Sequence, residues 1–199
     1  MTSVLAARPL TPGFKDPVFD GQRTFRAALD AFSRPGRAVE VAAVLGTPPG
    51  LAPAAAAFLL TMLDYETPLW LQHRGEALCD YVRFHCGAPL VEEPRVARFA
   101  LVTDASGMPD LAAFDAGVPE YPDRSATLVV QVPRLVGGRR VRVSGPGIPA
   151  ETHIEPAALR PDFWMQWQRN GAAFPCGVDV MFVCGSSFLA LPRTTKAEV

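Results

Sequence analysis

Residues 174–195, FPCGVDVMFVCGSSFLALPRTT, carry the clearest fold signal in this chain. The segment from Val178 to Cys184 is almost wholly apolar and rich in β-branched side chains, which is typical of a strand covered on both faces. Residues 185–187, Gly-Ser-Ser, have the chemistry of a turn, and 188–191 then predict a second short strand. We therefore expect a largely buried β-hairpin around which the rest of the chain is organised.

One carboxylate interrupts the first strand of this hairpin. Asp179 is the charged residue of that strand, and burying a lone carboxylate is costly unless a partner neutralises it. Arg193, Thr194 and Thr195 follow Pro192 at the exit of the second strand, where a guanidinium and two hydroxyls could clamp an anion. Equally, Arg193 could pair with a neighbouring acid such as Asp179. The sequence leaves both interpretations open.

Signals for strands and helices alternate along the rest of the chain. Short strands are expected at 38–41, 68–71, 99–103, 126–132 and 140–143. Helices are expected at about 20–32, 53–63, 76–85, 109–116 and 162–170. The alternation predicts an α/β fold in which helices sandwich a mixed sheet.

Three local features refine this expectation. The first helix has an apolar face at helical spacing, made by Phe25, Ala28, Leu29 and Phe32. Pro133 should place the strand at 126–132 at an edge or a bulge, because proline cannot donate to a sheet. The two glycines within 136–139 then predict a hairpin turn to the next strand.

Composition limits the classes of function. The chain has 199 residues, of which 49% are apolar and 20% charged, so it has either a large core or a surface buried in an assembly. A net charge of −1 gives no overall field that would favour nucleic acid or an anionic membrane. The longest apolar runs are too short to span a bilayer, and the N-terminal residues lack a signal-peptide pattern. We therefore expect a cytoplasmic protein.

The residue types that carry metal, redox or nucleophilic chemistry form no recognisable set. The cysteines, at 79, 86, 176 and 184, contain no Cys-x-x-Cys spacing, and the three histidines are scattered. We expect reduced thiols and no metal.

The Ser-Gly-Pro-Gly run at 144–147 could present backbone amides to a phosphate, but such a run is more often only a tight turn. Trp164 and Trp167 are expected to be core or interface residues.

The lysine count is informative about cofactors. The chain has two lysines, Lys15 near its start and Lys196, the fourth residue from the end of the printed sequence. An enzyme that uses pyridoxal phosphate needs a lysine to form the Schiff base, and neither position suits a buried imine. We therefore expect no such cofactor.

Several short motifs, in one order from about Pro12 to Val199, resemble the PhnH family of bacterial carbon–phosphorus lyase subunits. These motifs are PGF at 12–14, DP at 16–17, Gln22, Phe25-Arg26, SRPG at 33–36, ETPLWL at 66–71, RFH at 83–85, APLV at 88–91, GPGI at 145–148, FP at 174–175, GVD at 177–179 and LPRTT at 191–195. The resemblance covers nearly the whole chain.

The resemblance implies a fold and a set of partners. PhnH proteins have a three-layer α/β/α sandwich similar to that of pyridoxal-phosphate-dependent transferases, but without the cofactor. They form homodimers and assemble with PhnG, PhnI and PhnJ. The assembly replaces the adenine of ATP with an alkylphosphonate, which gives ribose 1-phosphonate 5-triphosphate, and the radical cleavage that follows belongs to PhnJ.

We therefore expect an accessory or scaffold subunit without catalytic groups of its own, built as an extension at 1–15 and a single domain at 16–199. A stand-alone α/β enzyme or binder for a small anion is the alternative. Candidate anion or partner contacts are Arg26, Gly145, Gly147, Asp179, Arg193, Thr194 and Thr195. We expect neither a nucleic acid nor a membrane as partner.

Overall fold

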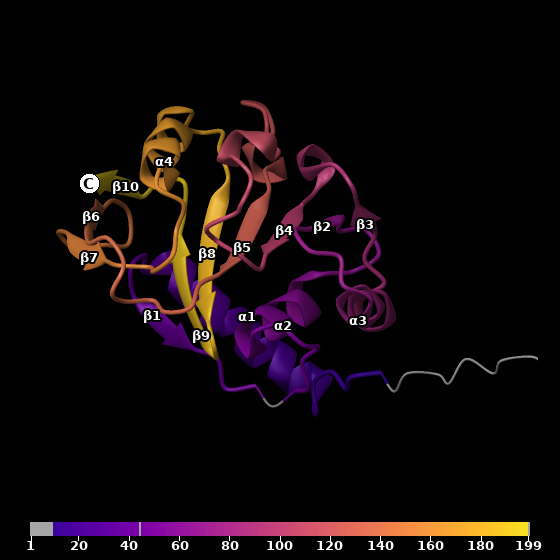
Figure 1. Ribbon diagram of the computed structural model, residues 1–199. Coiled ribbons are helices and arrows are strands. Elements are labelled where there is room, and N and C mark those ends of the chain that lie inside the picture. Colours follow the sequence, from indigo (N-terminus) through magenta and orange to yellow (C-terminus); the bar gives the residue numbers. More distant parts are fainter. Residues whose placement is uncertain (1–9, 44, 199) are drawn as a thin grey trace, which may run out of the picture.

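The structure is a computed structural model that describes residues 10–43 and 45–198 (Figure 1). Its main sheet has seven strands, in the order β1-β9-β8-β5-β4-β2-β3. The bounds of these strands are Ala38–Glu40 (β1), Leu69–Leu71 (β2), Leu90–Val91 (β3), Phe99–Val102 (β4), Thr127–Gln131 (β5), Asp179–Cys184 (β8) and Ser187–Leu191 (β9). Strands β2, β3, β4, β5 and β8 run parallel, whereas β9 and β1 are antiparallel to their neighbours, so the sheet is mixed as predicted.

The hairpin at 174–195 is confirmed. β8 and β9 pair antiparallel, with Val183 opposite Phe188, and both strands are largely buried. β8 also pairs in parallel with β5, so that Thr127 lies opposite Asp179. The hairpin therefore joins the parallel part of the sheet to its antiparallel edge.

Helices cover both faces of this sheet. One apolar core contains side chains of α1 (Pro17–Ser33), α2 (Pro53–Met62) and α3 (Glu76–Cys86), packed on the sheet residues that include Met181 and Phe188. The other core contains α4 (Phe163–Ala172) and the sheet residues that include Phe182. Short 3-10 helices complete the connections at Pro94–Val96 (η1), Leu111–Ala113 (η2) and Pro122–Arg124 (η3).

A second, three-stranded sheet lies beside α4 (Figure 1). Its order is β10-β6-β7, all antiparallel, with bounds Val141–Ser144 (β6), Thr152–Ile154 (β7) and Lys196–Glu198 (β10). β6 alternates between buried and exposed side chains, as the sequence predicted. This small sheet brings the residues that follow Arg193 next to α4.

Three expectations about individual elements are wrong. β5 lies between β4 and β8 in the interior of the sheet, and Pro133 causes no conflict because the strand has already ended at Gln131. Residues 136–139 make no hairpin, since they lead from β5 in the main sheet to β6 in the small one. The helix expected at 109–116 is reduced to the single turn η2.

The apolar face of α1 is also different from the prediction. Ala28 is buried, but Phe25 and Leu29 are 44% and 53% exposed, and the inward face is made by Asp20, Thr24, Ala28 and Ala31. Small side chains on this face let α1 pack closely on the alanine-rich α2 and on β9. Phe32 packs against the core as predicted, whereas the larger side chains of Phe25 and Leu29 are turned outward.

α1 begins at a well-formed cap. The Asp16 carboxylate accepts a hydrogen bond from the Phe19 amide at 3.2 Å, and the Asp20 carboxylate accepts one from the Asp16 amide at 2.9 Å. That backbone hydrogen bond, followed by the bond from the Arg23 guanidinium, lowers the pKa of Asp20. The first turn thus depends on two carboxylates that accept hydrogen bonds from backbone amides.

Acid should weaken this cap. Because the pKa of Asp20 is lower in the folded than in the unfolded chain, its carboxylate stabilises the fold above the unfolded pKa of about 3.9. This contribution disappears as the pH falls through the lower, folded pKa. We expect Asp20→Asn to lower the Tm at pH 7 and to have a smaller effect at pH 3, as measured by thermal unfolding. An equal effect at both pH values would contradict the assignment.

Residues 10–16, which precede α1, pack against the domain. Phe14 forms a bridge with Leu45, and a ring nitrogen of His85, Nε2, lies 2.9 Å from the Thr11 carbonyl oxygen. Residues 1–9 of the expected extension lie outside the described residues. Within the described ranges, no helix combines the length and apolarity that crossing a bilayer requires.

Candidate functional site

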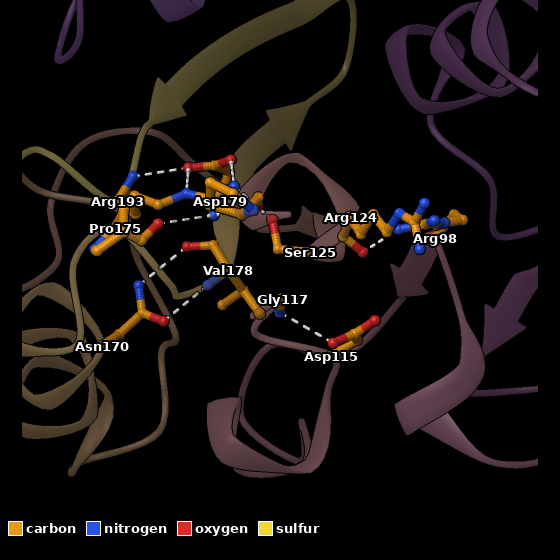
Figure 2. A network of polar contacts seen from close by, with 11 residues as sticks. Arg98, Asp115, Gly117, Arg124, Ser125, Asn170, Pro175, Val178, Asp179 and Arg193 are labelled. Atoms are coloured by element: carbon orange, nitrogen blue, oxygen red, sulfur yellow. Dashed lines mark hydrogen bonds and ion pairs between the residues drawn. The ribbon is translucent and has the colours of Figure 1, made fainter. Parts of the chain in front are cut away.

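The two charged residues of the hairpin form an ion pair (Figure 2). Arg193 donates from Nη2 to Asp179 Oδ2 at 2.5 Å and from Nε to Oδ1 at 3.2 Å, and its backbone amide donates to Oδ1 at 2.7 Å. The side chains are 14% and 20% exposed, so both charges are mostly removed from water. Of the two interpretations that the sequence left open, the structure shows the pairing of Arg193 with Asp179.

The rest of the guanidinium joins two further segments (Figure 2). Nη1 donates to the carbonyl oxygens of Pro122 and Pro175, at 2.9 and 3.4 Å, and Nη2 also donates to Ser125 Oγ. Together with the bonds to Asp179, these contacts use all five N–H groups of the side chain. An incoming anion would have to displace one of these partners, so the arrangement is that of a structural crosslink.

The glycines of the 144–147 turn allow close backbone approach. A Cβ on Gly145 would lie 2.9 Å from the Thr194 carbonyl oxygen, and one on Gly147 would lie 2.1 Å from that of Ser33. Both glycines have positive φ, at 135° and 82°. The turn therefore packs closely between the segment after β9 and the C-terminal end of α1.

Gly50 offers a matched control for this packing. It has the same φ as Gly147, 82°, but a Cβ there would have no atom within 4 Å. We expect Gly50→Ala to cost about 1 kcal/mol from backbone strain alone, and Gly147→Ala to cost about 3 kcal/mol or more because it adds a clash with backbone. Urea unfolding of the two variants measures the difference. Equal losses would show that the turn is not held against Ser33.

A cavity of about 520 Å³ lies between α4 and the segment that enters β10, and we call it the α4–β10 cavity. Its lining residues are Pro146, Trp167, Gln168, Gly171, Ala172, Phe174, Arg193, Thr194, Thr195, Lys196 and Ala197. Three predicted contact residues, at 193–195, are thus brought to one cavity, and the Gly145–Gly147 turn reaches it through Pro146. Their function as ligand or partner contacts stays a prediction.

One polar atom at this cavity has no partner. Thr195 is 2% exposed, and its Oγ1 makes no hydrogen bond within the part of the chain that the structure describes. Its backbone is well satisfied, since the amide donates to the Pro192 carbonyl and its own carbonyl accepts from Trp167 Nε1 at 2.9 Å. No pattern in the sequence indicates that this hydroxyl is buried.

Arg26 lies elsewhere, beside an exposed apolar surface of α1. The large side chains of this surface, which we call the α1 face, are Val18, Phe19, Phe25 and Leu29, at 75%, 60%, 44% and 53% exposure. Val18, Phe25 and Leu29 are spaced so that they share one side of the helix. Arg26 is exposed and lies one turn before Leu29, so it borders this face. Four large apolar groups on one surface helix are typical of a contact with another protein.

A polar cluster that the sequence analysis missed lies where strand order reverses. The chain leads from β2 to its neighbour β3 and then returns to pair β4 on the other side of β2. In open α/β sheets, ligands favour the carboxyl ends of strands at such a point. There the Gln72 side chain accepts from the amides of Thr103 and Asp104, and His73 Nδ1 lies 2.7 Å from Thr103 Oγ1. Polar residues directly after two buried strands were the signal that could have found it.

The groups of this cluster are mostly engaged with one another. Hydrogen bonds from the Ser106 side chain and amide lower the pKa of Asp104, which is therefore ionised at neutral pH. A second cavity of about 520 Å³ reaches the cluster at Thr103 and Asp104. The other lining residues of this cavity are largely apolar, among them Leu51, Val132 and Val183.

The four cysteines form no disulfide within the part of the chain that the structure describes. All four are free, and burial raises the pKa of the Cys86 thiol to about 11, which makes it a weak nucleophile at neutral pH. Within residues 10–43 and 45–198, no group of three or more His, Cys, Asp or Glu side chains is placed to hold a metal ion.

Comparison with known proteins gives consistent matches over nearly the whole chain. The model of the family described as "Bacterial phosphonate metabolism protein (PhnH)" matches residues 12–198. The "Alpha-D-ribose 1-methylphosphonate 5-triphosphate synthase subunit PhnH" of Rhizobium meliloti (strain 1021) is 38% identical over 187 residues, which cover 93% of this chain and 94% of the relative. The "Putative C-P lyase subunit protein HtxG" of Stutzerimonas stutzeri is 34% identical over 179 residues, covering 89% and 86% respectively.

Proposed function

The chain belongs to the PhnH family of bacterial phosphonate metabolism proteins, and from this we propose that it is an accessory subunit of a carbon–phosphorus lyase system in organic phosphonate catabolism. The name of its Rhizobium relative identifies a subunit of a ribose 1-methylphosphonate 5-triphosphate synthase. The reaction that the chain would support is therefore the formation of a ribose 1-phosphonate 5-triphosphate from ATP and an alkylphosphonate, with release of adenine.

The α1 face is the observation that carries this proposal. A subunit that acts by assembly needs an apolar surface that the monomer does not cover, and Phe25 and Leu29 provide one on a helix whose inner side is already packed. We place the contact with a partner on this face, with Arg26 at its rim. The partners proposed are PhnG, PhnI and PhnJ, with a homodimer of the chain in their absence, in the cytoplasm.

The catalytic step is assigned to the partners. Arg193, the best anion-binding candidate of the sequence, has all its N–H groups committed to Asp179, Ser125 and two backbone carbonyls. This geometry argues against the alternative of a stand-alone enzyme that clamps an anion at Arg193.

We also propose that the chain has a fold similar to that of pyridoxal-phosphate-dependent transferases but does not bind pyridoxal phosphate. Lys15 and Lys196 are both exposed, near opposite ends of the described chain, which is a poor environment for a buried imine. The similarity to pyridoxal-phosphate-dependent transferases is part of this proposal and can be tested by solving an experimental structure and by treating the chain with the cofactor and borohydride.

Co-expression tests the assembly directly. A tagged chain produced together with the partner subunits should retain them through affinity and size-exclusion steps, at a fixed stoichiometry. If the tagged chain elutes alone at micromolar concentrations while the partners form a complex without it, it is not a subunit.

A further inference from the structure

The α4–β10 cavity is separate from the α1 face and has the dimensions of a small-molecule site. Its volume of about 520 Å³ falls within the range of roughly 300–1,000 Å³ that is usual for ligand pockets. Three of the sequence motifs converge on it, since it is lined by Pro146 from GPGI, Phe174 from the FP motif and 193–195 from LPRTT. The accessory role proposed above does not require this cavity.

The walls favour a flat, apolar group. Trp167 and Phe174 contribute aromatic rings, Pro146 a rigid ring, and Gly171 and Ala172 little bulk. Phe174 is 62% exposed, so it stands at the opening, whereas Trp167 is 1% exposed and forms part of the base. Aromatic walls around a space with small residues suit a planar ring that stacks against them.

An extended peptide is a poor occupant, because the neighbouring strand edge is already covered by side chains. Trp167 Nε1 donates to the Thr195 carbonyl at 2.9 Å, and Gln168 Nε2 donates to the Ala197 carbonyl at 3.0 Å. An added strand would need these two carbonyl oxygens for its own hydrogen bonds. It would have to displace both side chains of α4.

Two polar groups of the cavity indicate which substituents a bound planar ring must have. Thr195 Oγ1 is buried and without a hydrogen-bond partner among the described residues, which is an unfavourable state that a ligand group could relieve. Lys196, on the same wall, is exposed and has no ion-pair partner within residues 10–43 and 45–198. Thr195 Oγ1 therefore calls for a hydrogen-bonding group deep in the cavity, and Lys196 calls for a negative charge at the cavity opening.

We propose that the α4–β10 cavity binds a small molecule that has a flat ring, a hydrogen-bonding group for Thr195 Oγ1 and an anionic substituent at Lys196. The probe for this class is 8-anilino-1-naphthalenesulfonate, which has fused rings, an N–H group and a sulfonate. Its neutral counterpart, N-phenyl-1-naphthylamine, lacks only the sulfonate. Binding is followed on the full chain by NMR, through the indole N–H signals of Trp70, Trp164 and Trp167.

The sulfonate probe should shift the Trp167 signal and leave Trp70 unaffected, and it should bind at least tenfold more tightly than the neutral probe. Lys196→Gln should remove that preference. Ala172→Phe fills the opening and should weaken binding more than tenfold, whereas Ala173→Phe, one residue along and outside the lining, should change it less than twofold. Probe binding that responds to none of these changes is adventitious and overturns the proposal.

Thr195→Val separates a ligand contact from a structural role. Removing an unsatisfied buried hydroxyl should raise the Tm of the free chain by about 2–5 °C and weaken the sulfonate probe about tenfold, while Thr195→Ser should retain binding. A lower Tm for Thr195→Val would show that the hydroxyl has an internal partner, which overturns the proposal. Loss of probe binding when the partner subunits assemble on the chain would also overturn the proposal. In that case the cavity would be filled by a side chain of a partner subunit.

Discussion

Arg193→Met should lower the free energy of unfolding by about 3–5 kcal/mol, the cost of leaving a mostly buried charge without its partner. The variant keeps much of the side-chain volume but leaves Asp179, at 20% exposure, without its counter-ion. It also releases the carbonyls of Pro122 and Pro175 and the Ser125 hydroxyl, so β8, η3 and the segment after β9 lose their common crosslink. Urea unfolding monitored by tryptophan fluorescence gives the difference.

Arg142→Met is the matched control. Arg142 also binds two carboxylates, of Glu151 and Glu198, but its side chain is 46% exposed, so little stability should be lost. Adding Asp179→Leu to Arg193→Met should recover part of the loss, because no unpaired charge then remains. If Arg193→Met unfolds like the wild type and loses only affinity for anions, the guanidinium is a ligand clamp and the structural assignment is wrong.

The double substitution Phe25→Asp with Leu29→Asp should abolish co-purification with partner subunits, with a fall in affinity of at least 100-fold. Central apolar residues of an interface each contribute about 2 kcal/mol or more when they are hot spots, and a buried carboxylate adds a desolvation penalty. Both side chains are about half exposed in the free chain, so the fold should persist. Pull-down with the co-expressed partners and a melting curve of the same sample measure the two effects.

Val96→Asp controls for a general loss of surface apolarity. Val96 is 55% exposed on η1, outside α1, and its replacement should leave co-purification unchanged. If the α1 variant still assembles normally, the proposed docking face is incorrect. If it fails to assemble and its Tm also drops by more than about 5 °C, the two aspartates have disturbed the packing of α1 instead.

The central hairpin could be predicted because its evidence is local. Val178 to Cys184, apolar except for Asp179, and the apolar run from Phe188 to Leu191 are separated by a short turn, and both strands formed as expected. The ion pair was foreseeable for a related reason: a lone carboxylate in an apolar strand needs a partner, and Arg193 emerges from the adjacent strand.

Features that depend on distant partners could not be read from the sequence. The periodicity of α1 marks Phe25 and Leu29 as apolar but does not say whether this chain or another protein covers them. Close packing on the alanines of α2 selected the small residues Ala28 and Ala31 for the inner face. Similarly, the alternation of β6 predicts one solvent-exposed face. It does not predict that β6 pairs with β7 and β10 and not with β5.

The cavity was missed because it is assembled from segments far apart in the sequence. Pro146, Trp167 and Lys196 come from a turn, a helix and the last described strand, and no spacing in the sequence connects them. The unsatisfied Thr195 hydroxyl is likewise a property of three-dimensional packing alone.

Adenine release is the most direct test of the claim that this chain contributes by assembly and not by chemistry of its own. Purified chain, purified partners and the reconstituted complex are each incubated with ATP and methylphosphonate, and free adenine is measured by chromatography. We predict release by the complete complex, none by the isolated chain, and a marked loss when the chain is omitted. Adenine formed by the isolated chain would contradict this account.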